Sequence, residues 1–238
     1  MVSFSLHGNQ EKGYDALSRL YYKFDSPGRQ EALVEHIVSA ALDHITLDGN
    51  VLPHVRYAVD DRDGRIVSIC KNFLGPREIE LPFSLVPYNI SDNLTSMFNF
   101  IESVETLFGL KDISLWLGCV FTIDCLFYNE DRHLNNLSLI QGVDGSVRYA
   151  PIFDNGAALG FHQQEPPYSI FEPNPFCMEQ LYAVPALLEG KYLSFDYTGF
   201  KRHYEPPTQY VRLISDSYLR RLEACVKGFP IPGVLEVV

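Results

Sequence analysis

Positive charge is scarce in this sequence of 238 residues. It has 19 Lys and Arg residues against 30 Asp and Glu, which gives a formal net charge of −11. An acidic surface disfavours nucleic acids and anionic membranes as partners, because both carry the same sign of charge. Any nucleotide would therefore have to be held locally, by a few cationic groups or by a metal ion.

The sequence also lacks paired cysteines, a leader-like segment and a long apolar run. Its five cysteines include no CxxC pair and do not cluster with histidine, so neither a disulfide framework nor a zinc site is predicted. The first 13 residues lack the basic and apolar regions of a signal peptide. The most apolar run, Ile113 to Phe127, is too short to span a bilayer and contains Asp124, so we interpret it as a buried helix. We expect a cytoplasmic protein without a membrane span.

The hydrophobic content is 46%, enough for one domain with a core or for two small lobes that share a cleft. Residues 1 to about 24 predict short strands at Ser3 to Leu6 and at Leu20 to Phe24, separated by a polar stretch. Apolar residues at helical spacing predict a helix from about Gln30 to Ile45, with one buried stripe and with Glu31 and Glu35 at its margin. Two further strands are expected at Val55 to Val59 and at Ile66 to Phe73, joined by a turn-rich segment.

From about residue 91 the pattern becomes helical. Ser91 and Asp112 are candidate caps for helices that run to Phe108 and to Phe127, and a last helix is expected from about Gln209 to Val226. The sequence thus predicts an α+β fold of two lobes. Residues 1–74 would form an N-lobe with a small sheet and one helix, and residues 75–238 a mainly helical C-lobe.

A polar hairpin lies between these helices. Asp144 and Gly145 stand between two apolar runs, which is a strong hairpin signal. If they form a two-residue turn, Asn135 lies opposite Asp154 and Asn136 lies opposite Phe153. The polar groups that precede the first strand and follow the second would then converge at the open end of the hairpin.

Converging Asp131, Asn136 and Asp154 side chains suit phosphoryl transfer. This reaction needs a carboxylate that accepts the proton of the nucleophile and hard oxygen ligands for Mg²⁺. Mg²⁺ would also supply the positive field that an acidic chain lacks. A solvated loop with an incidental cluster of charges is the competing interpretation, and the combination with Asn136 and Asp154 argues against it.

The motifs DRHLNN (131–136) and PIFDNG (151–156) resemble the catalytic loop and the metal-binding motif of HipA-like serine/threonine kinases, and less closely those of phosphatidylinositol kinases. The resemblance implies that Asp131 is the catalytic base and that Asn136 and Asp154 are metal ligands. It implies ATP and Mg²⁺ as cofactors. The residue after Asp154 is Asn155, which departs from the DFG motif of ordinary protein kinases and follows the HipA-like pattern.

The resemblance extends toward the N-terminus with lower specificity. The segment from Leu20 to Leu42 is similar to a strand, turn and helix in which a lysine contacts ATP phosphates and pairs with a glutamate of the helix. It implies Lys23 as the nucleotide lysine and Glu35 as its partner, with Glu31 as the alternative. The remaining nucleotide contacts that it implies are a phosphate-covering loop around Gly8 and Asn9, which lacks GxGxxG spacing, and a hinge between the lobes around Asn72 and Phe73.

Other polar residues of the region have structural interpretations. Asp124 would anchor the loop from within an apolar helix, because a buried carboxylate must be satisfied. Arg132 and His133 would support the loop by hydrogen bonding. Tyr168 and Ser169 are candidate modification sites in the proline-rich stretch from Gln163 to Pro175, which falls where an activation or substrate-binding segment would lie.

The function that this sequence predicts is a kinase that phosphorylates Ser or Thr of a protein, including itself. Three alternatives stay open: a lipid or small-molecule kinase with the same catalytic residues, a nucleotide-binding pseudokinase that acts as an interaction module, and an unrelated helical binding protein. The acidic composition argues mildly against lipid, and the joint presence of Asp131, Asn136 and Asp154 argues against a module that only binds. The acceptor protein, and the need for a partner chain, are left open.

Overall fold

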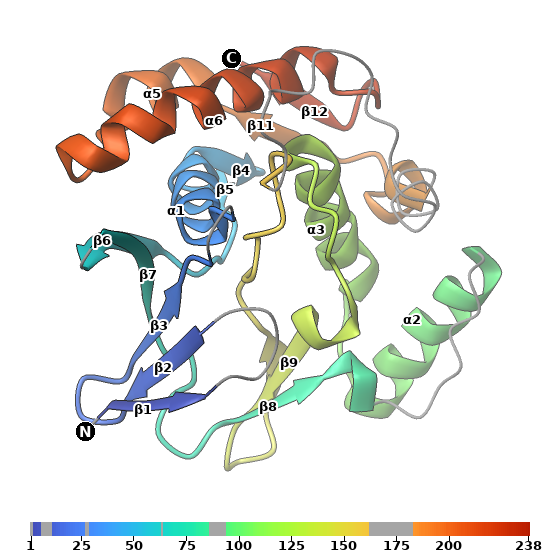
Figure 1. Ribbon diagram of the computed structural model, residues 1–238. Helices are drawn as coiled ribbons and strands as arrows, with labels where there is room; N and C mark the ends of the chain where they lie inside the picture. The colour runs from blue at the N-terminus through green and yellow to red at the C-terminus, as the bar shows by residue number, and fades with distance from the viewer. Residues whose placement is uncertain (1, 6–10, 27–28, 63, 86–93, 162–182) are drawn as a thin grey trace.

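The structure, a computed structural model, describes residues 2–5, 11–26, 29–62, 64–85, 94–161 and 183–238. Three sheets and several helices make up this part of the chain, so the fold is mixed α+β, as the sequence predicts (Figure 1). None of its helices has the length and apolar character needed to cross a membrane.

An antiparallel sheet of five strands is formed by the N-terminal residues, in the order β1-β2-β3-β7-β6. Its strands are β1 (Val2–Ser5), β2 (Glu11–Asp15), β3 (Leu20–Phe24), β6 (Tyr57–Arg62) and β7 (Arg65–Lys71). The polar strand β2 was not expected. It forms because it pairs on both edges, with β1 and with β3, and because Ser18 donates a hydrogen bond to Asp15 in the turn that follows. The predicted strand from Val55 to Val59 is wrong by about two residues, since β6 begins at Tyr57.

The helix α1 (Glu31–Leu42) packs between this sheet and two C-terminal helices (Figure 1). Its buried residues cover almost every side of the helix rather than the single stripe that we predicted, and Glu35 is buried among them, not at the margin. The expected end at Ile45 is also wrong. The helix ends at Leu42 because Ile45 begins a strand that pairs with Phe195.

Two smaller sheets complete the fold. The four-stranded sheet has the order β12-β11-β4-β5, so the strand at residues 45–47 pairs with the strand at residues 193–195 on one edge and with the strand at residues 50–51 on the other. The three-stranded sheet has the order β10-β9-β8. The strands are β4 (Ile45–Leu47), β5 (Asn50–Val51), β8 (Ile79–Pro82), β9 (Ser138–Gln141), β10 (Val147–Tyr149), β11 (Leu193–Phe195) and β12 (Leu235–Val237).

The β9–β10 hairpin is present, but its predicted register is wrong by one residue. Val147 pairs with Gln141, so three residues, 143–145, form the loop instead of two. Gly145 has a φ of 81° and donates its amide to the carbonyl oxygen of Gly142, which is the geometry of a three-residue hairpin loop. Asn135 and Asn136 consequently precede the strand pairing in the 3₁₀ turn η2 (Leu134–Asn136) and are not opposite Asp154 and Phe153.

The helices of the C-terminal part include α2 (Leu94–Phe108), α3 (Ile113–Phe127), α5 (Tyr197–His203) and α6 (Gln209–Gly228), and a 3₁₀ turn η1 spans Phe83–Leu85. α3 is buried along most of its length, which confirms its interpretation as a core helix. Asp112 precedes α3, but its side chain makes no capping hydrogen bond, so its predicted role is wrong. Ser91, the predicted cap of α2, lies outside the described residues. Cys70, Cys119, Cys125 and Cys225 are free thiols.

Candidate active site

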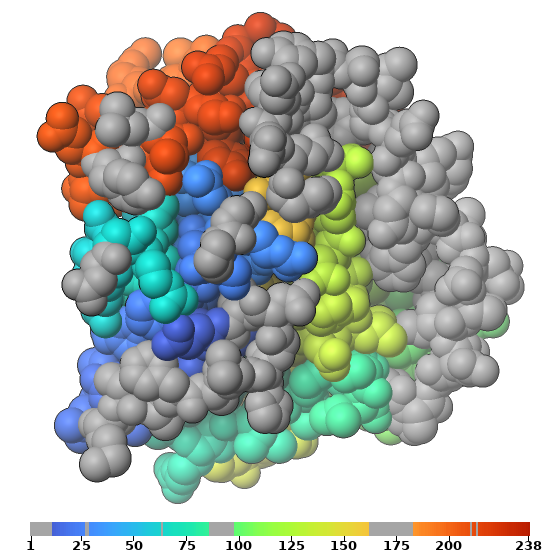
Figure 2. Space-filling view, in the orientation of Figure 1, coloured from blue at the N-terminus to red at the C-terminus, as the bar shows by residue number. Residues whose placement is uncertain are grey.

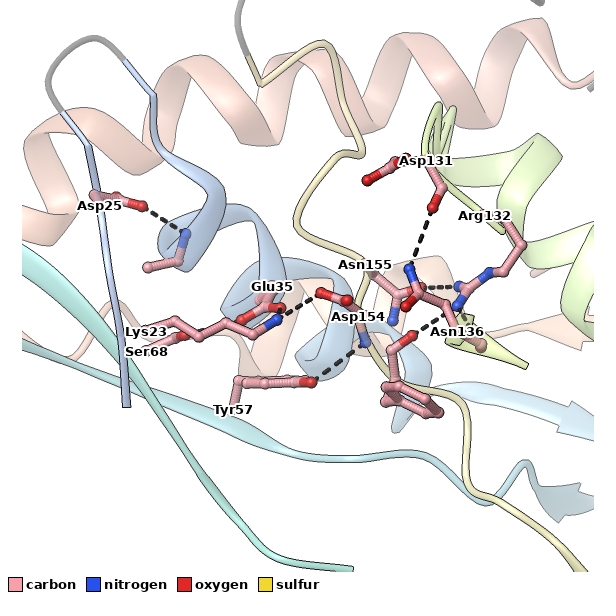
Figure 3. Close-up of polar contacts among 12 residues, drawn as sticks. Lys23, Asp25, Glu35, Tyr57, Ser68, Asp131, Arg132, Asn136, Asp154 and Asn155 are labelled. Carbon is pink, nitrogen blue, oxygen red and sulfur yellow. Dashed lines mark hydrogen bonds and ion pairs between the residues drawn. The ribbon is translucent and has the colours of Figure 1, made fainter. Parts of the chain in front are cut away.

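Lys23 connects the N-terminal sheet to α1 and to the segment that contains Asp154. From β3, its Nζ donates to Glu35 Oε1 of α1 at 2.5 Å and to Asp154 Oδ1 at 2.5 Å (Figure 3). Burial alone would lower the pKa of Lys23, but the carboxylates of Asp154 and Glu35 hold it well above its usual range. The lysine is therefore a fixed cation between two carboxylates.

Glu35 is the buried member of this cluster, with 1% of its side chain exposed. Ser68 lies directly across from Lys23 in the β3–β7 pairing and donates to the second carboxylate oxygen of Glu35 at 2.8 Å. Burial raises the pKa of Glu35 to about 7, and the nearby Asp154 adds to this effect while Lys23 opposes it. Glu31, the alternative partner of the lysine, instead pairs with Arg29.

Asp154 is partly exposed, with a third of its side chain accessible. Burial would raise its pKa, but Lys23 lowers it well below the usual range, so this carboxylate stays ionised. Its backbone has a φ of 57°, in the left-handed region that Asp tolerates better than most residues, and its amide donates to the buried Tyr57 hydroxyl at 3.3 Å. Left-handed non-glycine residues cluster at functional sites.

Arg132 joins the loop that contains Asp131 to the segment that contains Asp154. It is buried at 3% exposure and makes an ion pair with Asp124 of α3 at 3.0 Å. Its Nη1 donates to the carbonyl oxygens of Asn136 and Phe153, and its Nη2 donates to Asn155 Oδ1 at 2.6 Å. This agrees with the interpretation of Asp124 as an anchor and of Arg132 as a support. The Arg132 guanidinium therefore holds the two segments together, whereas the predicted register assigned this role to strand pairing.

Asp131 and Asn136 lie in the same loop as Arg132. The Asn136 side chain donates its Nδ2 to the backbone oxygen of Asp131 at 3.2 Å, and Asp131 is exposed (Figure 3). In the space-filling view, atoms of the segment near residue 155 emerge between those of α1 and those near residue 130 (Figure 2). The loop that contains Asp131, the Asp154 segment and α1 therefore meet at one surface region.

Gly156 permits the close approach of the Asp154 segment to α1. A Cβ atom at this position would lie 3.2 Å from the Glu31 Cβ, 3.3 Å from the Glu31 carbonyl oxygen and 3.3 Å from the Glu35 Cγ. All three atoms belong to α1, and at these distances the helix would have to give way. The glycine of the PIFDNG motif thus has a packing reason, which holds Asp154 within reach of Lys23.

The structure places the other predicted nucleotide residues as follows. Asn72 and Phe73 follow β7, where Asn72 accepts the amide of Leu74 at 2.9 Å and the Phe73 ring lies 5.4 Å from the ring of Phe153, next to Asp154. Gly8 and Asn9 lie outside the described residues. Sequence reasoning missed Tyr57 and Ser68, and only the strand register could have revealed the position of Ser68.

The donor set suits a Mg²⁺ ion bound together with phosphates. Mg²⁺ sites of this kind use one or two protein oxygen ligands, and phosphates and waters supply the rest. Asp154 has an ionised carboxylate with only Oδ1 bonded to Lys23, and Asn136 uses its amide nitrogen in its hydrogen bond, so its side-chain oxygen would be the atom offered to a metal ion. Among the described residues, no three or more His, Cys, Asp and Glu side chains are grouped so that they could hold a metal ion, so a Mg²⁺ ion here would need phosphate oxygens as further ligands.

Asp25 follows β3, and its side chain holds the start of α1. It is 8% exposed, and its Oδ1 accepts the amide of Ala32 at 2.7 Å. Within the described part of the chain, its Oδ2 is buried and has no hydrogen-bond partner. Burial raises the pKa of Asp25 to about 7, and the Ala32 amide opposes this only in part.

We expect the Asp25→Asn substitution to flatten the pH dependence of stability. A pKa of about 7 in the folded state, against an ordinary value of 3.8, means that the Asp25 contribution is complete below about pH 4 and is lost as the pH rises through 7. That loss is on the order of 4 kcal/mol. Asparagine keeps the oxygen that accepts from Ala32. The melting temperature of the variant relative to that of the wild type should be higher at pH 8 than at pH 5. An equal difference at both pH values would contradict the assignment.

Comparison with known proteins identifies the fold. No protein-family model and no curated relative matches the chain. Among solved structures, a Helicobacter pylori proinflammatory kinase, CtkA, matches with a TM-score of 0.62 over 96% of this chain and 93% of that chain, at 15% sequence identity. The chain therefore has a kinase-like α+β fold, which confirms the predicted fold class.

Proposed function

We propose that this protein is an ATP- and Mg²⁺-dependent phosphotransferase, most closely of the HipA-like serine/threonine kinase type. Its acceptor is the hydroxyl group of Ser or Thr in a protein, including its own chain. One observation carries the proposal: one partly buried lysine contacts a glutamate of α1 and an ionised aspartate of the PIFDNG motif at the same time. The kinase-like fold supports it independently.

The reaction is mainly a matter of positioning and charge, and the residues divide the work accordingly. Lys23, held in place by Glu35, would contact ATP phosphates. Asp154 and Asn136 would hold Mg²⁺, which supplies positive charge to the phosphate oxygens. Asp131 has an exposed carboxylate next to these groups and would accept the proton of the attacking hydroxyl.

A lipid or small-molecule kinase would use the same catalytic residues with another acceptor. Identification of the labelled product after incubation with γ-labelled ATP separates these cases: label on Ser or Thr of a protein supports the proposal, and label that enters only added lipids or small molecules contradicts its acceptor.

We propose a cytoplasmic protein on the basis of its composition.

The decisive experiment is thermal unfolding with ATP plus Mg²⁺ against either alone. A ligand that binds only the folded state at about 100 times its Kd stabilises it by roughly 2.7 kcal/mol, and the midpoint should rise by about 5 to 10 °C for a chain of this size. The combination should produce this rise, and each component alone should produce much less. No rise with the combination would contradict the nucleotide site.

The Lys23→Met variant should lose most of this ligand-induced rise, because methionine keeps most of the length of the side chain but removes the cation. Its ATP affinity should fall about tenfold. The exposed Lys227 of α6 offers a matched control, and Lys227→Met should keep the full rise. The comparison uses the ligand-induced rise of each variant, since the loss of Lys23 also leaves two carboxylates without their cation. An equal rise in both variants would remove Lys23 from the site.

A further inference from the structure

Two side chains of α6 hold the far end of the Asp154 segment. Arg221 donates its Nη1 to the carbonyl oxygens of Leu159 and Gly160, at 3.1 and 2.5 Å, and the Tyr218 hydroxyl donates to that of Phe161 at 3.2 Å. Arg221 is 2% exposed and lies over the Tyr218 ring, 4.7 Å from its centre. Three successive carbonyl groups are thus bound by residues one helical turn apart.

The backbone at this point is strained. Leu159 has a φ of 54° and Gly160 a φ of 59°, so two successive residues are left-handed, and for a leucine this conformation costs about 1 to 2 kcal/mol. The amide of Leu159 is bound to the carbonyl oxygen of Phe127 at the end of α3, and Phe161 closes a turn onto Ala158. A strained conformation persists only where its surroundings fix it, and α6 provides much of that fixation here.

The bound carbonyls are connected to the candidate catalytic groups by short steps. Ala158 donates its amide to the carbonyl oxygen of Asn155 at 3.2 Å, and Asn155 in turn binds Arg132. Ala157 accepts the amide of Glu130 at 3.2 Å, and Glu130 precedes Asp131. Two buried arginines therefore fix the two ends of one segment: Arg132 holds the end at residues 153–155 and Arg221 the end at residues 159–160.

We propose that Arg221 and Tyr218 are positioning residues that fix the segment 154–161, and through it the relation of Asp154 to Asp131. The proposal rests on the phosphotransferase function for its kinetic consequence. Its structural consequence, that these two side chains keep the left-handed turn closed, stands without it. A role in packing alone would stabilise the fold but would leave the segment and the catalytic rate unchanged in the folded protein.

The kinetic test compares Arg221→Lys, Arg221→Met and Tyr218→Phe with Arg220→Met, which changes the exposed neighbour on α6. A misplacement of catalytic groups by about 1 Å lowers turnover roughly a hundredfold. We expect Arg221→Met to lower kcat for γ-phosphate release or autophosphorylation about tenfold to a hundredfold, with the KM for ATP within about twofold of wild type. Arg221→Lys keeps the charge but not the planar fork and should fall between the two. Tyr218→Phe keeps the packing and should lower kcat about twofold to fivefold.

Amide hydrogen exchange is the second readout, measured below the melting temperature of every variant. Exchange at Leu159 and Phe161 should be at least about tenfold faster in Arg221→Met and in Tyr218→Phe, while Arg220→Met matches the wild type. Unchanged exchange and unchanged kcat in Tyr218→Phe and Arg221→Lys would overturn the proposal. Faster exchange in a chain whose wild type has no Asp131-dependent turnover would support the positioning role and reject the proposed function, so the two failures are distinguishable.

Discussion

Replacement of Asp131 by asparagine is expected to lower the rate of phosphoryl transfer about 10²- to 10⁴-fold, the usual contribution of a general base. The structure connects Asp131 to its surroundings through its backbone, since its amide donates to Asn129 and its carbonyl oxygen accepts from Asn136. The exposed side chain is therefore free to be changed without loss of these bonds. Single-turnover rates with γ-labelled ATP measure the effect.

Binding of ATP and Mg²⁺ should survive this substitution. The thermal midpoint should rise with ATP and Mg²⁺ as in the wild type, because neither Lys23 nor Asp154 is altered. The control is Asp216→Asn, which removes another exposed carboxylate on α6 and should leave the rate unchanged. Turnover that persists in Asp131→Asn at the wild-type rate would mean that the base is another residue.

Asp154→Asn is expected to abolish the Mg²⁺ dependence of nucleotide binding and to lower turnover by about 10³-fold, since a metal ion contributes several kcal/mol of charge stabilisation. Asparagine suits this test better than alanine, because it tolerates the left-handed backbone that Asp154 adopts. The loss should then reflect the missing carboxylate charge and not a distorted turn. ATP titrations with and without Mg²⁺ measure it.

The chain contains a matched control for this change. Asp112 is exposed, has a φ of 65° and makes no capping hydrogen bond, so Asp112→Asn alters a left-handed aspartate away from the site. Its ATP affinity should keep the full dependence on Mg²⁺. If Asp154→Asn also keeps this dependence, Asp154 is not a metal ligand.

Local patterns predicted the elements that depend on local chemistry. The helices near residues 31–42, 113–127 and 209–228 were predictable because apolar residues recur at helical spacing. Strands β4, β11 and β12 have only three residues each and are defined by partners far along the chain, so no local pattern marks them. The hairpin register failed for a related reason: Gly145 suits loops of two and of three residues, and only the pairing decides between them.

The residues of the candidate site also divide into those that local motifs predicted and those that depend on long-range packing. Lys23, Glu35 and Asp154 belong to motifs that resemble a known family, and the structure brings them into contact. The residues that hold these groups in place carry no such signal. Ser68, Tyr57 and Arg221 act from β7, β6 and α6, and their roles depend on long-range packing that a single sequence does not reveal.

The pairing of β4 with β11 limits how a protein of this shape can be regulated. Only Asp43 and His44 separate the end of α1 from a strand that is hydrogen-bonded to residues 193–195. Because this connection is so short, the helix that bears Glu35 has little room to rotate outward and break its contact with Lys23. We therefore expect on–off control to be exerted at the nucleotide or at the acceptor, and fluorescence energy transfer between probes on α1 and α5 should change little when ATP and Mg²⁺ are added.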